Sequence, residues 1–197
     1  MNLSTRERIL RATLAAMDGP GGAESVTMRA IAAAAGVTAM AIYKHFPNRE
    51  LLLQAAAAAE YGRIAGYFER ANADTRVPGL RGMLGYLDYA LDHPQLFRYV
   101  FAQHRDDAFA YPDDLQGGKS PTFNILQSIV AQLMDRGVLR RDDPGEVALS
   151  IWAHAHGLVS LYLSGRIALS RAAFRALYQR SLDRLLYGLR PECSRPD

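Results

Sequence analysis

The sequence contains very little cysteine and no long apolar run. Cys193 is the single cysteine of the 197 residues, and it lies in a polar C-terminal segment. One thiol excludes a disulfide framework and a metal site built from several thiolates. No apolar run reaches the length of about 18 residues that a membrane-spanning helix needs, and no apolar signal segment follows the first charged residues. We therefore expect a cytoplasmic protein without a membrane partner.

The signatures of catalytic and cofactor sites are missing as well. No serine stands in a Gly-x-Ser-x-Gly pattern, and no carboxylate pair is placed for acid/base chemistry. The glycine-rich segment 19–22 follows a predicted helix and lacks the ending of a nucleotide-binding loop. A helix would point His154 and His156 in nearly opposite directions, so they would not chelate one metal ion. We expect no enzyme, no cofactor and no metal.

The balance of charge gives only weak evidence of a nucleic-acid partner. The net charge is +3, and residues 1–50 carry six basic and four acidic side chains. Because non-specific affinity for DNA grows with the number of phosphates neutralised, one copy of this segment should bind DNA poorly. Two copies joined in a dimer would double the contacts. A hydrophobic content of 49% supports a folded core.

Helical patterning dominates the chain. Ser4 and Glu7 form a capping box at the start of the first predicted helix, which ends at the Gly-Pro sequence after Asp18. Segment 105–120 is the longest predicted loop. No segment predicts a strand, so the fold class is all-α with about nine helices. The later helices are predicted over residues 51–72, 80–92, 94–104, 121–136, 144–165 and 170–188.

Residues 27–49 predict two short helices joined by a tight glycine turn. Thr27 is a good N-cap for the first helix, and Thr38 is a good N-cap for the second. Gly36 stands where the chain must adopt a left-handed conformation to end the first helix. Together these features predict a helix-turn-helix. The positions expected to face inward are Met28, Ile31, Ala32, Ala35, Ile42 and Phe46.

The second of these helices, residues 39–46, leaves one side for a partner. Tyr43, Lys44 and His45 offer long donors that suit phosphates, and the short side chains at the helix start allow approach to base edges. Arg49 stands in the first turn of the next helix, where a positive charge is unfavourable, which indicates a phosphate contact. The alternative is that Tyr43 and His45 only pack a small helical domain.

Residues 36–49 resemble the DNA-binding domain of the TetR family of transcriptional repressors. The family pattern of glycine, valine, several small residues and then aliphatic-Tyr-x-His-Phe appears at 36–46. Ala39 and Met40 stand where relatives often carry glycine, proline or a polar residue, so we expect few specific hydrogen bonds to bases. The resemblance implies DNA contacts by Thr27, Met28, Arg29, Thr38, Ala39, Met40, Tyr43, Lys44, His45 and Arg49.

Small residues form a stripe along the predicted helix over 144–165. They recur at spacings of three and four, the period of a close helix-helix seam, and the last helix has a comparable face. This pattern fits packing within one chain or between two chains. The resemblance favours a homodimer, because relatives dimerise through their last two helices. The predicted interface comprises Ser150, Ala153, Gly157, Ser160, Ser164, Leu177 and Ser181.

Trp152, His156 and Gly157 resemble a Trp-x-x-x-His-Gly signature of one C-terminal branch of the TetR family. Trp152 and His156 stand four apart, on one helical face. With Tyr86, Phe97 and Phe101 they are our candidates for lining a cavity that binds an unknown small-molecule effector. The alternative is a packed tryptophan and a hydrogen-bonded core histidine.

These observations lead to one functional hypothesis. The chain is interpreted as a helix-turn-helix DNA-binding domain over residues 1–50, a ligand-binding and dimerisation domain over 51–190, and a polar tail over 191–197. It is expected to repress transcription from a palindromic double-stranded DNA operator until a small ligand releases it. The alternatives are a helical binding or catalytic protein with a vestigial helix-turn-helix, and a transcriptional activator.

Overall fold

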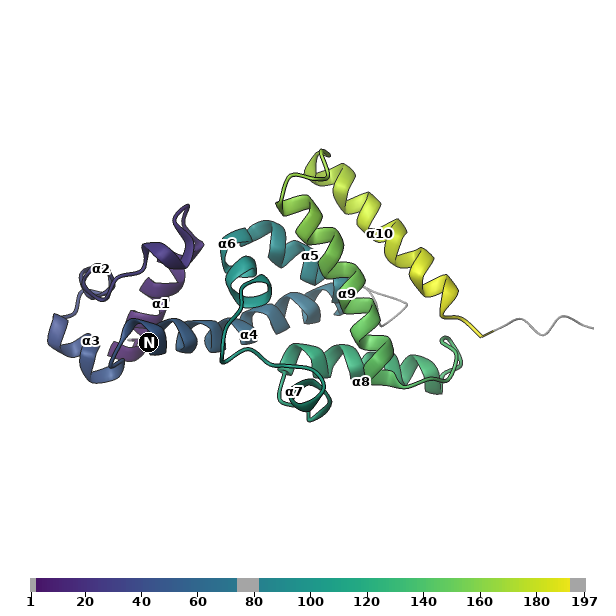
Figure 1. Cartoon of the computed structure of the whole chain (residues 1–197), viewed down its shortest axis with the longest axis horizontal. Helices are drawn as coiled ribbons and strands as arrows, with labels where there is room; N and C mark the ends of the chain where they lie inside the picture. The colour runs from purple at the N-terminus through teal and green to yellow at the C-terminus, as the bar shows by residue number, and fades with distance from the viewer. Residues whose placement is uncertain (1–2, 74–81, 192–197) are drawn as a thin grey trace, which may run out of the picture. The chain divides into compact units, whose positions relative to one another are not determined.

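The computed structural model describes residues 3–73 and 82–191, and these form ten α-helices, one 3-10 turn and one π-helical turn (Figure 1). No strand occurs in these two ranges, which confirms the all-helical class. The segment between the helices predicted over 51–72 and 80–92, apart from residue 73, and Cys193 lie outside the described residues. Internal contacts divide the chain into a first unit, residues 1–63 and 89–108, and a second unit, residues 64–88 and 109–197.

The first unit is built on helix α1, which packs against its neighbours η1, α2 and α6. The predicted capping box is present, because the Ser4 hydroxyl accepts from the Glu7 amide at 3.3 Å and the Glu7 carboxylate accepts from the Ser4 amide at 2.8 Å. The elements that contribute to this unit are α1 (Thr5–Asp18), η1 (Gly22–Ser25), α2 (Met28–Ala34), α3 (Ala39–His45), α4 (Arg49–Ala73), α5 (Gly82–Asp92), α6 (Pro94–Phe97) and the π turn η2 (Arg98–Ala102).

The second unit contains the later part of α4, most of α5, and helices α7 (Asp113–Gln116), α8 (Pro121–Asp135), α9 (Pro144–Leu163) and α10 (Arg171–Gly188). Helix α9 packs against both α8 and α10. A Cβ atom at Gly85 would lie 2.3 Å from the Tyr67 carbonyl oxygen, so glycine lets α5 approach α4 closely. The buried Tyr178 hydroxyl donates to the Met83 carbonyl at 2.9 Å and ties α10 to α5.

Two stretches differ from the helices expected from the sequence. The predicted helix over 94–104 is the short helix α6 followed by the π turn η2, which ends at Ala102. The predicted loop over 105–120 contains the short helix α7. The two compact units divide α4 between Arg63 and Ile64, whereas the sequence placed a domain boundary after residue 50. That boundary stays a prediction, because a compact unit and a functional domain need not share limits.

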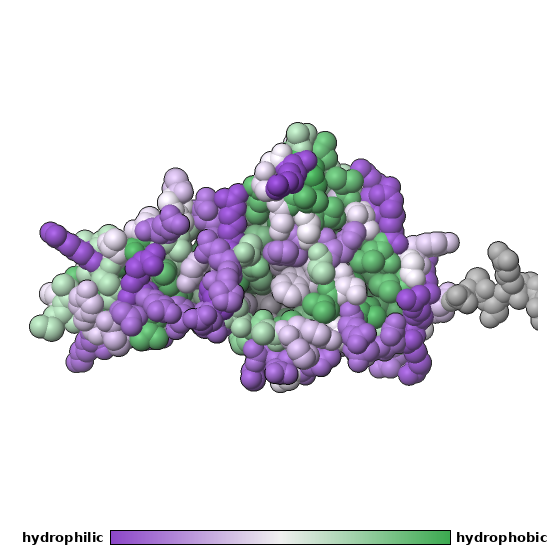
Figure 2. Space-filling view, in the orientation of Figure 1, coloured by the Kyte–Doolittle hydropathy of each residue, from purple (hydrophilic) through white to green (hydrophobic). Residues whose placement is uncertain are grey.

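The surface of the second unit has an apolar region. Figure 2 shows hydrophobic residues over the turn between α9 and α10, where Leu161 and Leu169 are each 43% exposed. None of the helices in the described ranges has the length and apolar character needed to cross a membrane.

Candidate nucleic-acid interface and effector site

Local capping shapes the segment that carries the predicted DNA interface. The Thr27 hydroxyl accepts from the Ala30 amide at 3.2 Å and begins α2, and the Thr38 hydroxyl accepts from the Ala41 amide at 3.2 Å and begins α3. Gly36 has a φ of 62°, the left-handed conformation expected at the end of α2. The helix-turn-helix predicted from residues 27–49 is therefore confirmed, together with both of its N-caps.

The inward side of the helix-turn-helix is apolar and buried. Ile31, Ile42 and Phe46 are 1%, 0% and 3% exposed. Met28 is 9% exposed, because it occupies the first inward position of the apolar stripe on α2. Its side chain is therefore packed into the core of the unit, and its expected DNA contact stays a prediction that only its backbone at the start of α2 can meet.

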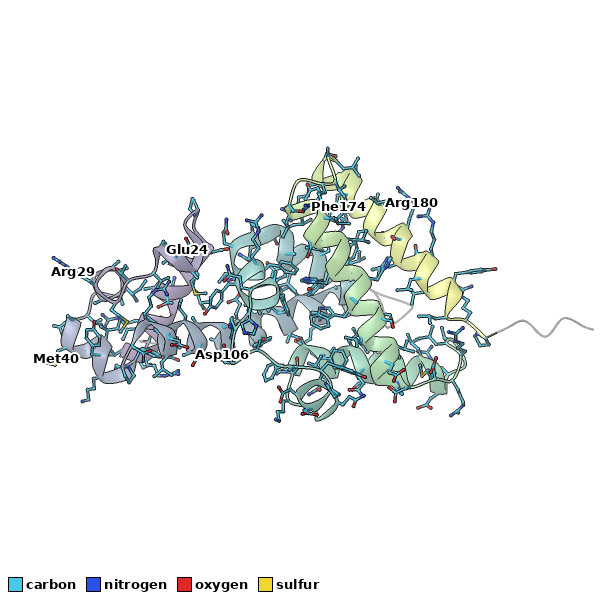
Figure 3. All side chains as sticks on the ribbon, in the orientation of Figure 1. Glu24, Arg29, Met40, Asp106, Phe174 and Arg180 are labelled. Carbon is cyan, nitrogen blue, oxygen red and sulfur yellow. The ribbon has the colours of Figure 1, made fainter. Side chains whose placement is uncertain are left out.

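The outward side of α3 is open to solvent. Met40 and Tyr43 are 81% and 52% exposed, and Lys44 and His45 are also exposed. Figure 3 shows Met40 at the free end of α3, with its side chain pointing away from the helix, and Arg29 projecting from α2. The expected contact residues that are exposed are Thr27 and Arg29 at the start of α2 and Thr38, Ala39, Met40, Tyr43, Lys44 and His45 at α3.

An arginine from α1 holds the turn of the motif. Arg8 donates from Nε and Nη2 to the Ala35 carbonyl at 3.1 and 2.6 Å, and from Nη2 to the Gly36 carbonyl at 2.7 Å. The last carbonyls of a helix have no partner within the helix, so a guanidinium is well suited to bind them. The sequence alone does not predict this contact, because Arg8 lies far from the turn along the chain and carries no local signature.

A second arginine, which we expected at a phosphate, also binds backbone carbonyls. Arg49 donates from Nε to the Val26 carbonyl at 2.7 Å and from Nη2 to the Ala23 carbonyl at 2.6 Å. These carbonyls lie in and just after η1, and the Ala23 carbonyl also accepts from the Val26 amide at 3.2 Å. The guanidinium that we expected at a phosphate thus binds backbone carbonyls of the chain itself, which explains its position at the start of α4, and its contact with DNA stays a prediction.

Polar contacts also link α1, α4 and α6 within the first unit. His93, which precedes α6, places Nδ1 2.7 Å from an Asp18 carboxylate oxygen and Nε2 2.6 Å from Arg63 Nη2. Arg63 Nη1 donates to Glu60 at 3.3 Å. Glu60 is fully buried, and this burial raises the pKa of its carboxyl group, although the charge of Arg63 opposes the shift. No sequence motif predicted this cluster.

Three of the five expected effector residues meet in the second unit. Trp152 Nε1 donates to the Tyr86 hydroxyl at 3.2 Å, and that hydroxyl lies 3.0 Å from His156 Nδ1. His156 Nε2 lies 3.2 Å from the Ser160 hydroxyl, and burial lowers the pKa of the imidazole. The alternative of a tryptophan and a histidine satisfied inside the fold thus agrees with these contacts.

The other two expected effector residues, Phe97 and Phe101, belong to the first unit. Their ring centroids are 5.4 Å apart, and Phe101 meets Tyr61 edge-on at 6.4 Å. Phe97 is 1% exposed. Both therefore contribute to aromatic packing around α4 and α6.

Two family models match this chain, one in its N-terminal part and one in its C-terminal part. The model of the tetR family of bacterial regulatory proteins matches residues 9–56, and the model of the tetracyclin repressor-like C-terminal domain matches residues 80–185. The chain belongs to the TetR family. This confirms the resemblance found at residues 36–49, and it makes the protein a DNA-binding transcriptional regulator.

Named relatives of this TetR-family chain are transcriptional repressors. It is 32% identical over 189 residues to the HTH-type transcriptional repressor KstR of Mycolicibacterium smegmatis, covering 93% of this chain and 87% of the relative. It is 48% identical over 163 residues to KstR of Rhodococcus jostii, covering 83% of this chain and 71% of the relative.

Solved structures share the fold. A protein of unknown function from Rhodococcus superposes with a TM-score of 0.79 at 22% identity, covering 96% of this chain and 97% of that one. A TetR transcriptional regulator from Streptomyces coelicolor gives a TM-score of 0.50 at 26% identity, covering 95% and 99% of the two chains.

The small-residue stripe of the TetR-family chain lies on α9, and its serine hydroxyls have partners within the chain. Ser150 donates to the Glu146 carbonyl at 3.0 Å, and Ser164 donates to the Leu161 carbonyl at 3.2 Å. Ser181 on α10 lies 3.0 Å from His154 Nε2. Gly157 is surrounded by open space, since a Cβ atom there would meet nothing within 4 Å.

We predict that Arg8→Met destabilises the TetR-family chain by about 1–3 kcal/mol, because it leaves the carbonyls of Ala35 and Gly36 without their charged donor. Urea unfolding followed by circular dichroism measures the change. Arg11→Met is the control, because Arg11 is exposed on the same helix. Equal effects of the two substitutions would show that the Arg8 contacts do not hold the turn.

We also predict that His156 makes stability depend on pH. Burial lowers its pKa below the ordinary value of 6.5, so the unfolded chain binds more protons than the folded chain in the window just below that value. Stability should therefore fall as the pH drops from 6.5, with a slope of up to about 1.4 kcal/mol per pH unit.

Thermal or urea unfolding across this window tests the prediction with His156→Gln, which should flatten the curve relative to wild type. His104→Gln is the control, because the side chain of His104 is 95% exposed. A wild-type curve that matches that of His156→Gln at every pH would contradict the prediction.

Proposed function

We propose that the protein is a homodimeric repressor that inserts one α3 helix per subunit into successive major grooves of a pseudo-palindromic operator. The observation that carries this proposal is the division of α3 into a closed side, with Ile42 and Phe46 buried, and an open side with Tyr43 and Lys44 exposed. A recognition helix needs both sides, because one fixes its orientation and the other contacts the duplex. The relatives named as repressors support the same direction of regulation.

The two ends of the open side of α3 carry chemically different side chains. Tyr43, Lys44 and His45, at the C-terminal end of α3, are the donors proposed for phosphates, with Arg29 and Thr27 on the preceding helix. The N-terminal end of α3 carries Ala39 and Met40, which are short or apolar and can approach base edges.

The small number of basic residues supports a second subunit. Residues 1–50 contain six basic residues. Two of them, Arg8 and Arg49, donate hydrogen bonds from their guanidinium groups to backbone carbonyls. Few cations remain for phosphates, so one subunit neutralises little of the DNA charge. Two subunits double these contacts, provided that their recognition helices match half-sites about 34–36 Å apart.

The proposed dimer interface is the exposed face of α9 and α10. Its serines already have hydrogen-bond partners within the chain, so a dry interface would leave no serine hydroxyl unsatisfied. Ala153 is exposed and Gly157 has open space around it, so a second backbone can approach closely.

Release by a small molecule completes the proposal. The polar groups of Tyr86, Trp152 and His156 converge in the second unit, where they are hydrogen-bonded to one another, and the proposed effector would replace some of these mutual contacts. Linkage makes the regulation reciprocal, because an effector that weakens operator binding must itself bind more weakly to the operator complex.

We predict that Lys44→Ala weakens operator binding and flattens its salt dependence. Loss of one phosphate contact in each subunit should reduce the slope of log affinity against log salt by about 0.9 per subunit. The operator is first selected from random DNA, and its affinity is then measured by fluorescence anisotropy at several salt concentrations. Tyr43→Phe should weaken binding with little change in slope.

Lys119→Ala is the matched control for this experiment. Its ammonium group is exposed in the second unit and pairs with Asp114 at 2.7 Å. The control should keep the wild-type slope. Slopes that are equal for wild type and Lys44→Ala would exclude the proposed docking, and failure to select any preferred site would exclude an operator-specific repressor.

We predict that Gly157→Leu disrupts the dimer, because a large side chain would fill the space that a partner helix needs. Sedimentation analysis should show a shift from dimer to monomer, with a parallel loss of operator affinity. Gly62→Leu is the control, because a Cβ atom at Gly62 also meets nothing within 4 Å and the residue lies on α4. A Gly157→Leu variant that dimerises like wild type would remove this face from the interface.

A further inference from the structure

The first turn of α3 exposes apolar groups where a recognition helix approaches the bases. Ala39, Met40 and Ala41 follow the cap Thr38, whose hydroxyl accepts from the Ala41 amide at 3.2 Å. Neither alanine has a polar side-chain atom, and methionine offers only a weak acceptor and no donor. This turn cannot make the paired hydrogen bonds by which arginine contacts guanine or by which asparagine and glutamine contact adenine.

Met40 is nevertheless presented to solvent. It is 81% exposed, more than any other exposed large hydrophobic side chain in the described residues. Its neighbour Ile42 is fully buried and Phe46 is 3% exposed, so the unit has an apolar interior from which Met40 is excluded. Figure 3 shows Met40 at the edge of the molecule, beside the start of α3. An apolar side chain in this position suits a DNA groove that presents an apolar group where the side chain would reach.

The major groove offers one such group, the C5 methyl of thymine. Each other base edge there presents hydrogen-bond donors or acceptors, to which a thioether and two methyl groups contribute little. The methionine side chain is long and unbranched with a polarisable sulfur, so it can adapt to a methyl group on the floor of the groove.

We infer that Met40 is a specificity-determining residue that selects a thymine in each half-site by contact with its methyl group. The inference rests on the proposed docking of α3 in the major groove. Tyr43 and Lys44 would supply affinity for the backbone, and Met40 would distinguish thymine from the other bases. Removing one buried methyl group corresponds to about fourfold in affinity, so the effect is measurable for each half-site.

The test replaces thymines of the selected operator by deoxyuridine, one symmetric pair at a time, which removes the methyl group and keeps base pairing. Wild-type protein should lose about fourfold in affinity per half-site at one position. Met40→Ala should bind the unmodified operator more weakly and show no loss at that position. Met40→Leu, which keeps an apolar side chain, should retain most of the sensitivity.

A second substitution in the DNA adds a methyl group instead of removing one. Deoxycytidine at the sensitive position should weaken wild-type binding, and 5-methyldeoxycytidine should recover part of that loss, but only when Met40 is present. Val138→Ala is the matched protein control, because Val138 is 42% exposed outside α3 and its variant should keep the full sensitivity.

The outcomes separate this inference from the proposed function. If an operator is selected and bound but every deoxyuridine substitution leaves wild-type affinity unchanged, the thymine contact is excluded while the repressor proposal stands. Equal losses in wild type and Met40→Ala would assign the methyl contact to another residue and overturn the inference. If no site is enriched from random DNA, the proposed function fails, and the inference fails with it.

Discussion

The carbonyl oxygens that close α2 are bound by a guanidinium group from α1, and the direction of α3 depends on this contact. Arg8 lies 2.6 Å from the Ala35 oxygen and 2.7 Å from the Gly36 oxygen. Gly36 supplies the left-handed turn, but a single glycine permits many geometries and does not select one. Hydrogen bonds from a charged, planar donor restrict that choice. Because α3 begins soon after the turn, the same contacts set the angle at which its open side faces a duplex.

Features encoded by neighbouring residues could be predicted from the sequence. The capping box of Ser4, the caps Thr27 and Thr38 and the turn at Gly36 all depend on residues a few positions apart, and the structure has each of them. Helix periodicity likewise indicated which residues of α3 are buried. The DNA-binding function followed from the same short segment, because its residue types and spacing belong to the family that the comparisons confirm.

Features that join distant residues could not be predicted. Arg49 showed an anomaly in the sequence, a positive charge at the start of a helix, but only the fold shows that Val26 and Ala23 supply its acceptors. Met28 was assigned two roles by the sequence; the structure shows its side chain in the core, and its contact with DNA stays a prediction. Short elements such as α7 and the π turn η2 depend on tertiary packing rather than on local periodicity.

The contacts of His93 fix the position of a proton. The guanidinium of Arg63 carries only donors, so the imidazole nitrogen that lies 2.6 Å away, Nε2, must offer its lone pair. In a neutral ring the hydrogen then resides on Nδ1 and points to the Asp18 carboxylate at 2.7 Å. A single tautomer, in a single ring orientation, satisfies both neighbours at once. The end of α1 and the middle of α4 are thus joined through the ring of His93, which lies between the guanidinium and the carboxylate.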